Sequence, residues 1–124
     1  MAFFHLDIKQ PFNTITASGN THTVDLDKKA NNYSITANNA TNTIAFSNLD
    51  SDKIGKGGTI LITNPSSVGS LGWAALPSTA YTPGGSTINF DTTASKIAAM
   101  TYLVIASNKI LINYVGAFDS YPQP

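Results

Sequence analysis

The two histidines of the chain, His5 and His22, are the first residues to consider for chemistry. A Ser-His-Asp triad would need the fold to set one of them against a serine and an aspartate. Twelve serines and seven aspartates allow many such combinations, so none of them is informative. His22, Val24 and Leu26 lie on one face of a predicted strand by the period of two. We therefore predict that His22 is a strand residue at a sheet rim. We predict no catalytic residue and no enzyme; the alternative is a small hydrolase.

Two pairs of aspartates, Asp25 with Asp27 and Asp50 with Asp52, each place two carboxylates on one side of an extended segment. Ca²⁺ takes about six to eight oxygen ligands, and an EF-hand loop adds a glycine and a distant glutamate. The chain has no glutamate and no cysteine, and neither pair is followed by this pattern. Glycosidase chemistry needs two carboxyl groups across a cleft, and nothing selects such a pair. We therefore predict no metal site.

The segment Gly55-Lys56-Gly57-Gly58-Thr59 has the residue types of a phosphate-binding loop without their order. Such a loop reads G-x-x-x-x-G-K-[ST], follows a strand and opens a helix. Here the lysine stands before the second glycine, and a strand pattern follows. We predict a turn and no nucleotide or other cofactor.

Trp73 and Tyr81 are candidates for contacts with a host glycan. Trp73 is the only tryptophan, and with Tyr81 and the Pro83-Gly84-Gly85 turn it could form a platform for a sugar ring. The alternative is a core or rim tryptophan whose N–H finds a hydrogen-bond partner.

The composition indicates a β-protein with many tight connections. The charged residues are seven lysines and seven aspartates, with no arginine or glutamate, and threonine, serine and asparagine make up nearly a third of the chain. Threonine suits strands, while serine and asparagine suit turns. The net charge of zero provides no field to attract nucleic acid, and the missing arginine removes the commonest reader of bases. We predict no nucleic-acid partner.

Short runs of alternating or continuous apolar residues, separated by turn residues, predict about eight strands. The clearest is a hairpin in which Met100–Ala106 and Ile110–Val115 flank Ser107-Asn108-Lys109. The prediction is an all-β fold: a single antiparallel β-sandwich or jelly-roll-like domain. The alternative for residues 93–100 is one or two helical turns. The expected strands are residues 14–17, 21–26, 33–37, 44–46, 58–63, 86–90, 100–106 and 110–115, and the expected core is Leu26, Ile35, Ile44, Phe46, Ile60, Ile62, Phe90, Leu103, Ile105 and Leu111.

A faint repeat links two segments twenty residues apart. Ile15-Thr16-Ala17 precedes Thr21-His22-Thr23-Val24, and Ile35-Thr36-Ala37 precedes Thr41-Asn42-Thr43-Ile44. A solenoid needs at least about three units to bury a continuous core. Two copies indicate two similar strand-turn-strand units, stacked or facing each other; the alternative is chance in a chain rich in threonine and asparagine.

Short strand and turn motifs follow one another along residues 21–118. They are Thr23-Val24-Asp25-Leu26, Thr43-Ile44-Ala45-Phe46-Ser47-Asn48, Gly57-Gly58-Thr59-Ile60-Leu61-Ile62-Thr63, Gly72-Trp73, Pro83-Gly84-Gly85, Phe90-Asp91-Thr92-Thr93, Met100-Thr101-Tyr102-Leu103-Val104, Lys109-Ile110-Leu111 and Val115-Gly116-Ala117-Phe118. The order of these motifs resembles a β-sandwich domain of tailed-phage virion proteins (tail, fibre or capsid decoration). One departure is Ala98-Ala99-Met100, where that family usually carries an aspartate before the final hairpin.

The resemblance implies a bacteriophage virion structural protein. The implied role is a capsid decoration or cement protein that forms a homotrimer and binds the major capsid protein or other virion proteins. The alternative is a receptor- or glycan-binding module of a phage fibre or tail. The chain begins without the apolar run and basic lead of a secretory signal and has no stretch of ~18 apolar residues. We therefore expect synthesis in the host cytoplasm, no membrane partner and a place in the virion.

The expected organisation is an N-terminal arm (residues 1–12), the β-sandwich domain (13–118) and a C-terminal tail (119–124). Large apolar side chains on a free terminus are a liability in a monomer. We expect the arm to dock on a neighbouring subunit or on the capsid; the alternative is that it folds back on its own sandwich. The expected partner-docking residues are Phe3, Phe4, Leu6, Ile8 and Tyr121.

Overall fold

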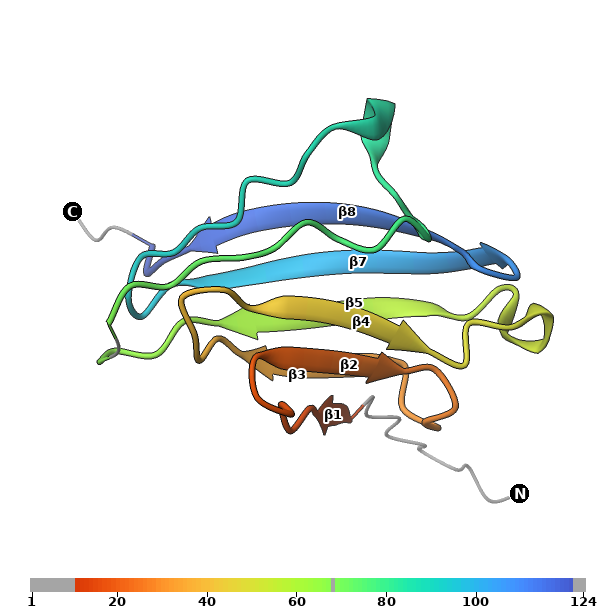
Figure 1. Ribbon diagram of the computed structural model, residues 1–124, viewed down its shortest axis with the longest axis horizontal. Coiled ribbons are helices and arrows are strands. Elements are labelled where there is room, and N and C mark those ends of the chain that lie inside the picture. The colour runs from red at the N-terminus through yellow and green to blue at the C-terminus, as the bar shows by residue number, and fades with distance from the viewer. Residues whose placement is uncertain (1–10, 68, 122–124) are drawn as a thin grey trace, which may run out of the picture.

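The computed structural model describes residues 11–67 and 69–121, and its regular structure there is almost entirely β (Figure 1). None of its helical segments is long and apolar enough to cross a membrane. The elements are β1 (Phe12–Thr14), β2 (Thr21–Asp25), β3 (Asn32–Thr36), β4 (Thr43–Ser47), the 3-10 turn η1 (Ser51–Lys53), β5 (Gly57–Thr63), β6 (Ala80–Tyr81), the 3-10 turn η2 (Pro83–Gly85), β7 (Ile97–Ala106) and β8 (Lys109–Phe118).

Two sheets form the fold. The large sheet has the order β1-β3-β5-β7-β8-β6, and the small sheet pairs β2 with β4. The all-β, sandwich-like fold is confirmed, but the pairing is mixed. Only β5–β7 and β7–β8 are antiparallel, while β1–β3, β3–β5, β2–β4 and β6–β8 are parallel. The parallel pairs among β1 to β5 arise because the chain alternates between the sheets there, so each strand of one sheet returns in the same direction.

This alternation gives the faint repeat its structural meaning. Phe12 pairs with Asn32 in the large sheet, and Thr21 pairs with Thr43 in the small one, so the two segments are stacked coils. The segment around Trp73 continues the stack, because Trp73 forms a parallel bridge with Asn42 beside β4. In Figure 1 the green segment after β5 accordingly runs alongside β4.

The core lies between the two sheets. His22, Val24 and Leu26 share one face of β2 and the residue after it, as predicted, and this face points inward to Tyr33 and Ile35 of β3. His22 is buried and does not lie at the sheet rim that the sequence predicted. Five of the predicted core residues are buried and two, Phe46 and Phe90, are half-buried against the core. The five are Leu26, Ile35, Ile44, Ile60 and Ile62.

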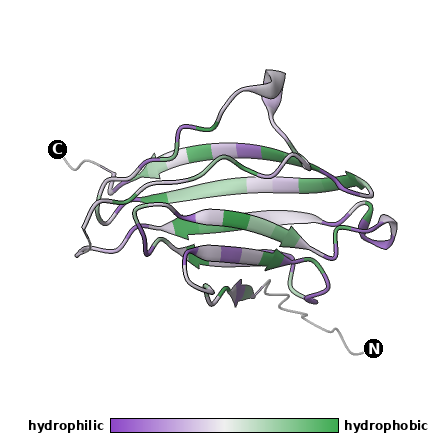
Figure 2. Ribbon diagram, in the orientation of Figure 1, coloured by the Kyte–Doolittle hydropathy of each residue, from purple (hydrophilic) through white to green (hydrophobic). Residues whose placement is uncertain are grey.

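The prediction for the C-terminal hairpin chose the wrong face for the core. Leu103, Ile105 and Leu111 are exposed, while Tyr102 and Val104 point into the core with Ile110 and Ile112. Both faces of this hairpin are apolar, and Figure 2 shows the long hydrophobic stretches of β7 and β8, so the period of two could not choose between them. The Tyr102 hydroxyl can be buried because it donates to the Asn31 carbonyl at 2.6 Å.

Two further expectations for the second half of the chain differ from the structure. Residues 86–90 are not a strand, although Phe90 packs on the core. β7 begins at Ile97, so the helical alternative for residues 93–100 is wrong. The hairpin itself is confirmed: Ala106 pairs with Lys109, and Asn108 takes the positive φ of 57° that a tight turn needs.

Candidate functional site

The outer face of β5, β7 and β8 is the strongest candidate for function. On this face large apolar side chains point away from the core, and among the described residues no second layer covers them. Six of them are between 39% and 51% exposed: Ile97, Leu103, Ile105, Leu111, Val115 and Phe118. We use "outer face" for these six together with Gly57, Thr59, Leu61, Thr63, Ala99, Thr101 and Asn113.

The strand register sets these residues in rows across the sheet. Leu103 lies opposite Leu111, Ala99 opposite Val115, and Ile97 opposite Phe118. Directly opposed residues share a face and have Cβ atoms within about 5.5 Å. The apolar side chains therefore form two patches, which the row of Thr101, Asn113 and Thr59 separates.

The outer face carries no charged side chain. Charges stand at its two ends. Lys109 begins β8, with its ammonium 5.0 Å from the centre of the Tyr81 ring. At the other end Lys96 forms an ion pair with Asp119. Most monomeric surfaces interleave charged residues with apolar ones, so this face is of the kind that another protein covers.

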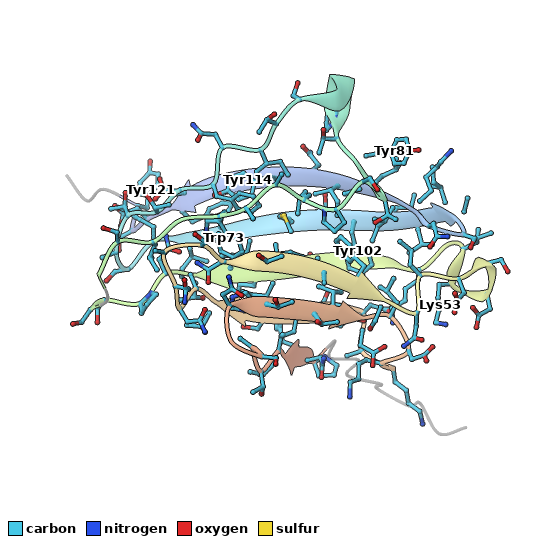
Figure 3. The ribbon with its side chains drawn as sticks, in the orientation of Figure 1. Lys53, Trp73, Tyr81, Tyr102, Tyr114 and Tyr121 are labelled. Atoms are coloured by element: carbon cyan, nitrogen blue, oxygen red, sulfur yellow. The ribbon has the colours of Figure 1, made fainter. Side chains whose placement is uncertain are left out.

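A depression of about 360 Å³ marks the Lys109 end of the outer face. Tyr81 pairs with Leu111 through β6, and Thr82 and Pro83 rise beside the strand. Thr101 and Leu103 line the opposite side of this depression. Figure 3 shows Tyr81 projecting at the edge of β8, away from the core.

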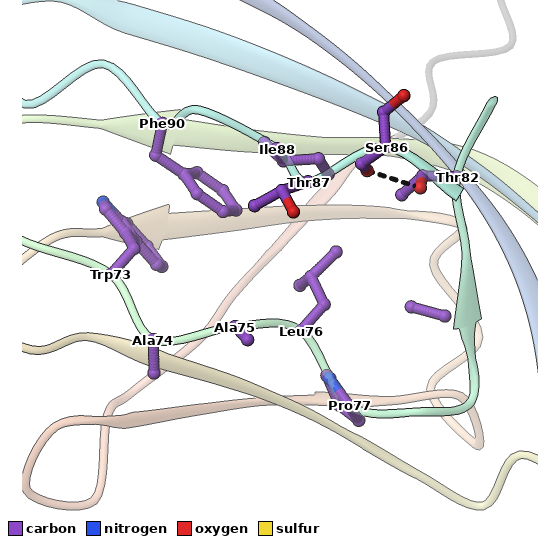
Figure 4. Close-up of a pocket in the computed structure, with 11 residues that line it drawn as sticks. Trp73, Ala74, Ala75, Leu76, Pro77, Thr82, Ser86, Thr87, Ile88 and Phe90 are labelled. Atoms are coloured by element: carbon purple, nitrogen blue, oxygen red, sulfur yellow. Dashed lines mark hydrogen bonds between the residues drawn. The ribbon is translucent and has the colours of Figure 1, made fainter. Parts of the chain in front are cut away.

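A second cleft, of about 280 Å³, lies between residues 73–77 and 82–90 (Figure 4). Its walls are mainly apolar, with Trp73, Leu76, Ile88 and Phe90 among them. Thr82, Ser86 and Thr87 supply hydroxyl groups, although the Thr82 hydroxyl already donates to the Ser86 carbonyl at 2.6 Å. An apolar cleft with a few hydroxyls is a general small-ligand site.

The structure separates the two predicted glycan-contact residues. Trp73 lines the cleft of Figure 4, whereas Tyr81 lines the depression on the outer face. One face of the Trp73 indole stacks on Phe90, with ring centroids 4.7 Å apart, and the His22 ring lies at 5.9 Å. Trp73 and Tyr81 therefore line two different hollows.

Several of the groups considered for chemistry make structural contacts, while His5 lies outside the described residues. His22 is buried, and its Nε2 bonds Asn42 Oδ1 at 2.9 Å. Asp25 accepts hydrogen bonds from Asn48 Nδ2 and from the Asp27 amide, and the Asn48 bond in particular lowers the pKa of Asp25. Asp27 pairs with Lys53 at 2.6 Å. In residues 11–67 and 69–121 no three ligating side chains converge as a metal site would require.

Lys56, the lysine of the glycine-rich segment, is held by main-chain carbonyls. Its ammonium donates to the Leu26 oxygen at 3.0 Å and to the Lys28 oxygen at 2.6 Å. Burial lowers the pKa of this lysine. Gly57 and Gly58 belong to β5, where Gly58 lets the Asn31 carbonyl approach closely. The segment therefore joins the coil stack to β5 and does not form a phosphate loop.

The predicted docking residues Phe3, Phe4, Leu6 and Ile8 lie outside the described residues. Tyr121 follows the end of β8 and is 83% exposed (Figure 3). The sequence analysis missed the outer face, because it assigned Leu103, Ile105 and Leu111 to the core. The signal was present in β7 and β8, which are apolar at almost every position although only one face of each can meet the core.

Comparisons of the chain with protein-family models, with curated proteins and with solved structures find no significant match.

Proposed function

We propose that this protein is a non-enzymatic structural component of a bacteriophage virion. Its role is that of a capsid decoration or cement protein, which forms a homo-oligomer (three copies, as the resemblance implies) and binds the capsid surface. Its place is the virion, and its partners are itself and the major capsid protein or other virion proteins.

The single observation that carries the proposal is the uncharged, exposed outer face. Contiguous exposed apolar surface on a soluble domain marks a site of protein–protein contact, and a rigid β-sheet supplies it without ordering a loop. The candidate catalytic groups support the same conclusion, since His22, Asp25 and Asp27 are bound to structural partners. Tyr121, with Phe3, Phe4, Leu6 and Ile8, is proposed to contact the capsid.

Immunogold labelling of particles of the phage that encodes the chain tests this proposal. Regular label over the head is expected for a decoration protein. Label confined to the tail or fibres would instead mean that the protein has its structural role in the tail or fibres. Particles without label would contradict it. Deletion of residues 1–10 should abolish co-sedimentation with purified capsids while leaving the melting temperature unchanged. An unfolded product would instead assign the arm to the domain's own core.

A second candidate function, glycan binding at a fibre or tail, is favoured by the cleft of Figure 4. The cleft joins an aromatic wall at Trp73 and Phe90 to the hydroxyls of Ser86 and Thr87. A glycan array tests it, with Thr87→Trp as the variant that fills the cleft and Thr23→Trp as the control on the outside of β2. Binding that Thr87→Trp alone abolishes would support this function.

A further inference from the structure

We infer that the outer face is the surface through which copies of this chain bind one another. The inference rests on the proposed function, in which the protein acts as an oligomer, and it names the face and the occupant. The occupant is the same face of another copy.

The exposure of this face is the first reason. Within the same two strands, the inward residues Met100, Tyr102, Val104, Ile110 and Ile112 are at most 4% exposed, whereas the outward Leu103, Leu111, Val115 and Phe118 are 40–51% exposed. Half-exposed leucine, valine and phenylalanine side chains on both sides of the Thr101–Asn113 row leave apolar surface in contact with water. Covering it removes that surface from water, which favours association.

The size of the face is the second reason. β7 and β8 contain ten residues each, which corresponds to a length of about 33 Å. The three strands of the outer face, β5, β7 and β8, span about 14 Å at ~4.8 Å per strand. The resulting flat area of about 470 Å² lies below the ~600 Å² that one partner of a small specific interface buries. A partner must therefore cover the whole face, as a second sheet does and a short peptide does not.

The charge pattern disfavours a charged partner and fits a second copy of the chain. A neutral face gains nothing from a charged partner, and any charge placed on it would be buried without a counter-ion. Two copies place neutral surface against neutral surface. The polar row of Thr59, Thr101 and Asn113 fits this arrangement, because hydroxyl and amide groups both donate and accept hydrogen bonds and can pair with their own kind.

The shape of the outer face is also self-complementary. At one end Tyr81, Leu103 and Leu111 border the depression of about 360 Å³. At the other end Phe118 projects, 51% exposed, opposite Ile97. One copy thus offers a large apolar side chain of the kind that the depression of another copy can accept.

The test is sedimentation equilibrium of the full chain without any capsid, comparing the natural chain with Thr101→Lys and Thr23→Lys. Both threonines are exposed strand residues, but Thr101 lies in the centre of the outer face and Thr23 on the outside of β2. We expect an oligomer of two or three chains whose dissociation constant rises roughly 100-fold or more in Thr101→Lys, because buried like charges would oppose each other. Thr23→Lys should not change it.

A natural chain that stays monomeric, or a Thr101→Lys chain that associates as tightly as Thr23→Lys, overturns the inference. Melting of each variant shows that the chain is folded, and a variant Thr101→Asp replaces Thr101→Lys should the latter unfold. Capsid binding is measured separately. A monomer that labels the capsid refutes the inference and leaves the proposed function intact. An oligomer absent from virions refutes the function and leaves the interface intact.

Discussion

Asn42 and His22 come from neighbouring coils, twenty residues apart in the sequence, and are joined in the interior by a hydrogen bond of 2.9 Å between Oδ1 and Nε2. The Asn42 amide nitrogen donates to the carbonyls of Asn39 and Gly72, so its Oδ1 is an acceptor. It follows that His22 Nε2 carries a hydrogen. Asn42 Oδ1 also accepts a hydrogen bond from the main-chain N–H of Asn38. One side chain thereby connects three successive passes of the chain.

Asn42→Ala is therefore expected to lower the free energy of unfolding by roughly 2–4 kcal/mol, because it leaves the buried His22 N–H and the Asn38 N–H without partners. The matched control is Asn20→Ala. Asn20 occupies the equivalent corner of the preceding coil, since Thr21 pairs with Thr43, but its amide makes an exposed bond to the Thr41 carbonyl. We expect that change to cost under about 1 kcal/mol. Urea unfolding of both variants gives the comparison; equal losses would mean that Asn42 does not connect the coils.

Gly72 is expected to tolerate no side chain, because a Cβ there would overlap the carbonyl oxygen of Ala40 in the adjacent coil. The Gly72 carbonyl also accepts the Asn42 main-chain N–H at 2.8 Å, so a shift of this segment breaks that bond. Gly72→Ala should lower the melting temperature by several degrees, in line with a loss of roughly 1–3 kcal/mol.

The control for Gly72→Ala is Gly69→Ala in the same connection, where nothing lies within 4 Å of the added carbon. We expect Gly69→Ala to leave the melting temperature within about one degree of that of the natural chain. A fall in melting temperature as large as that of Gly72→Ala would show that any Gly→Ala change in this segment destabilises the chain. The contact with Ala40 would then not be the cause.

The sequence predicts most of the strands because their signals are local. His22, Val24 and Leu26 alternate, and the hairpin turn at Asn108 is short and polar. The parallel stacking was harder to predict, because the third pass, around Trp73, does not repeat the motif of the first two coils. It is held by bonds of the Asn42 main chain and side-chain amide that connect residues about thirty positions apart.

The candidate site was the least predictable part. Placing the outer face requires knowing which side of the hairpin faces β2 and β4, and two apolar sides give no local answer. The choice depends on long-range contacts, such as the bond of Tyr102 to Asn31. The separation of Trp73 from Tyr81 is likewise a property of the loop path, which the spacing of eight residues does not determine.

Adjacent residues of β8 test the observed register. Ile112 is buried and Leu111 is 40% exposed. Ile112→Ala should cost about 2–5 kcal/mol of unfolding free energy, as buried large-to-small changes do, and Leu111→Ala under about 1 kcal/mol. Both changes are made in Thr101→Lys, which we expect to be monomeric, so that no partner covers Leu111. Urea denaturation measures the two losses of unfolding free energy. A larger loss for Leu111→Ala would mean that Leu111 faces the core, as predicted from the sequence.

Alkaline pH should unfold the protein through its two buried tyrosines. Burial raises the pKa of Tyr33 to about 12 and also raises the pKa of Tyr102. Their hydroxyls donate to the Asp25 carbonyl at 2.7 Å and the Asn31 carbonyl at 2.6 Å, and a phenolate would lose these bonds. Because the pKa of Tyr33 in the folded chain lies above the unfolded value near 10, its contribution is complete below about pH 10. It is lost as the pH rises through about 12.

Each pKa unit corresponds to about 1.4 kcal/mol, so Tyr33 alone should remove roughly 2–3 kcal/mol across this range. Urea unfolding at a series of pH values, followed with phenolate absorbance, measures the loss. Tyr33→Phe should be less stable at neutral pH, since the Asp25 carbonyl loses its donor, yet its stability should fall less steeply above pH ~10. Tyr81→Phe, which leaves both buried hydroxyls in place, is the control and should keep the slope of the natural chain. If Tyr33→Phe kept that slope as well, the alkaline loss would come from other groups, and Tyr33 would not be the tyrosine whose ionisation unfolds the core.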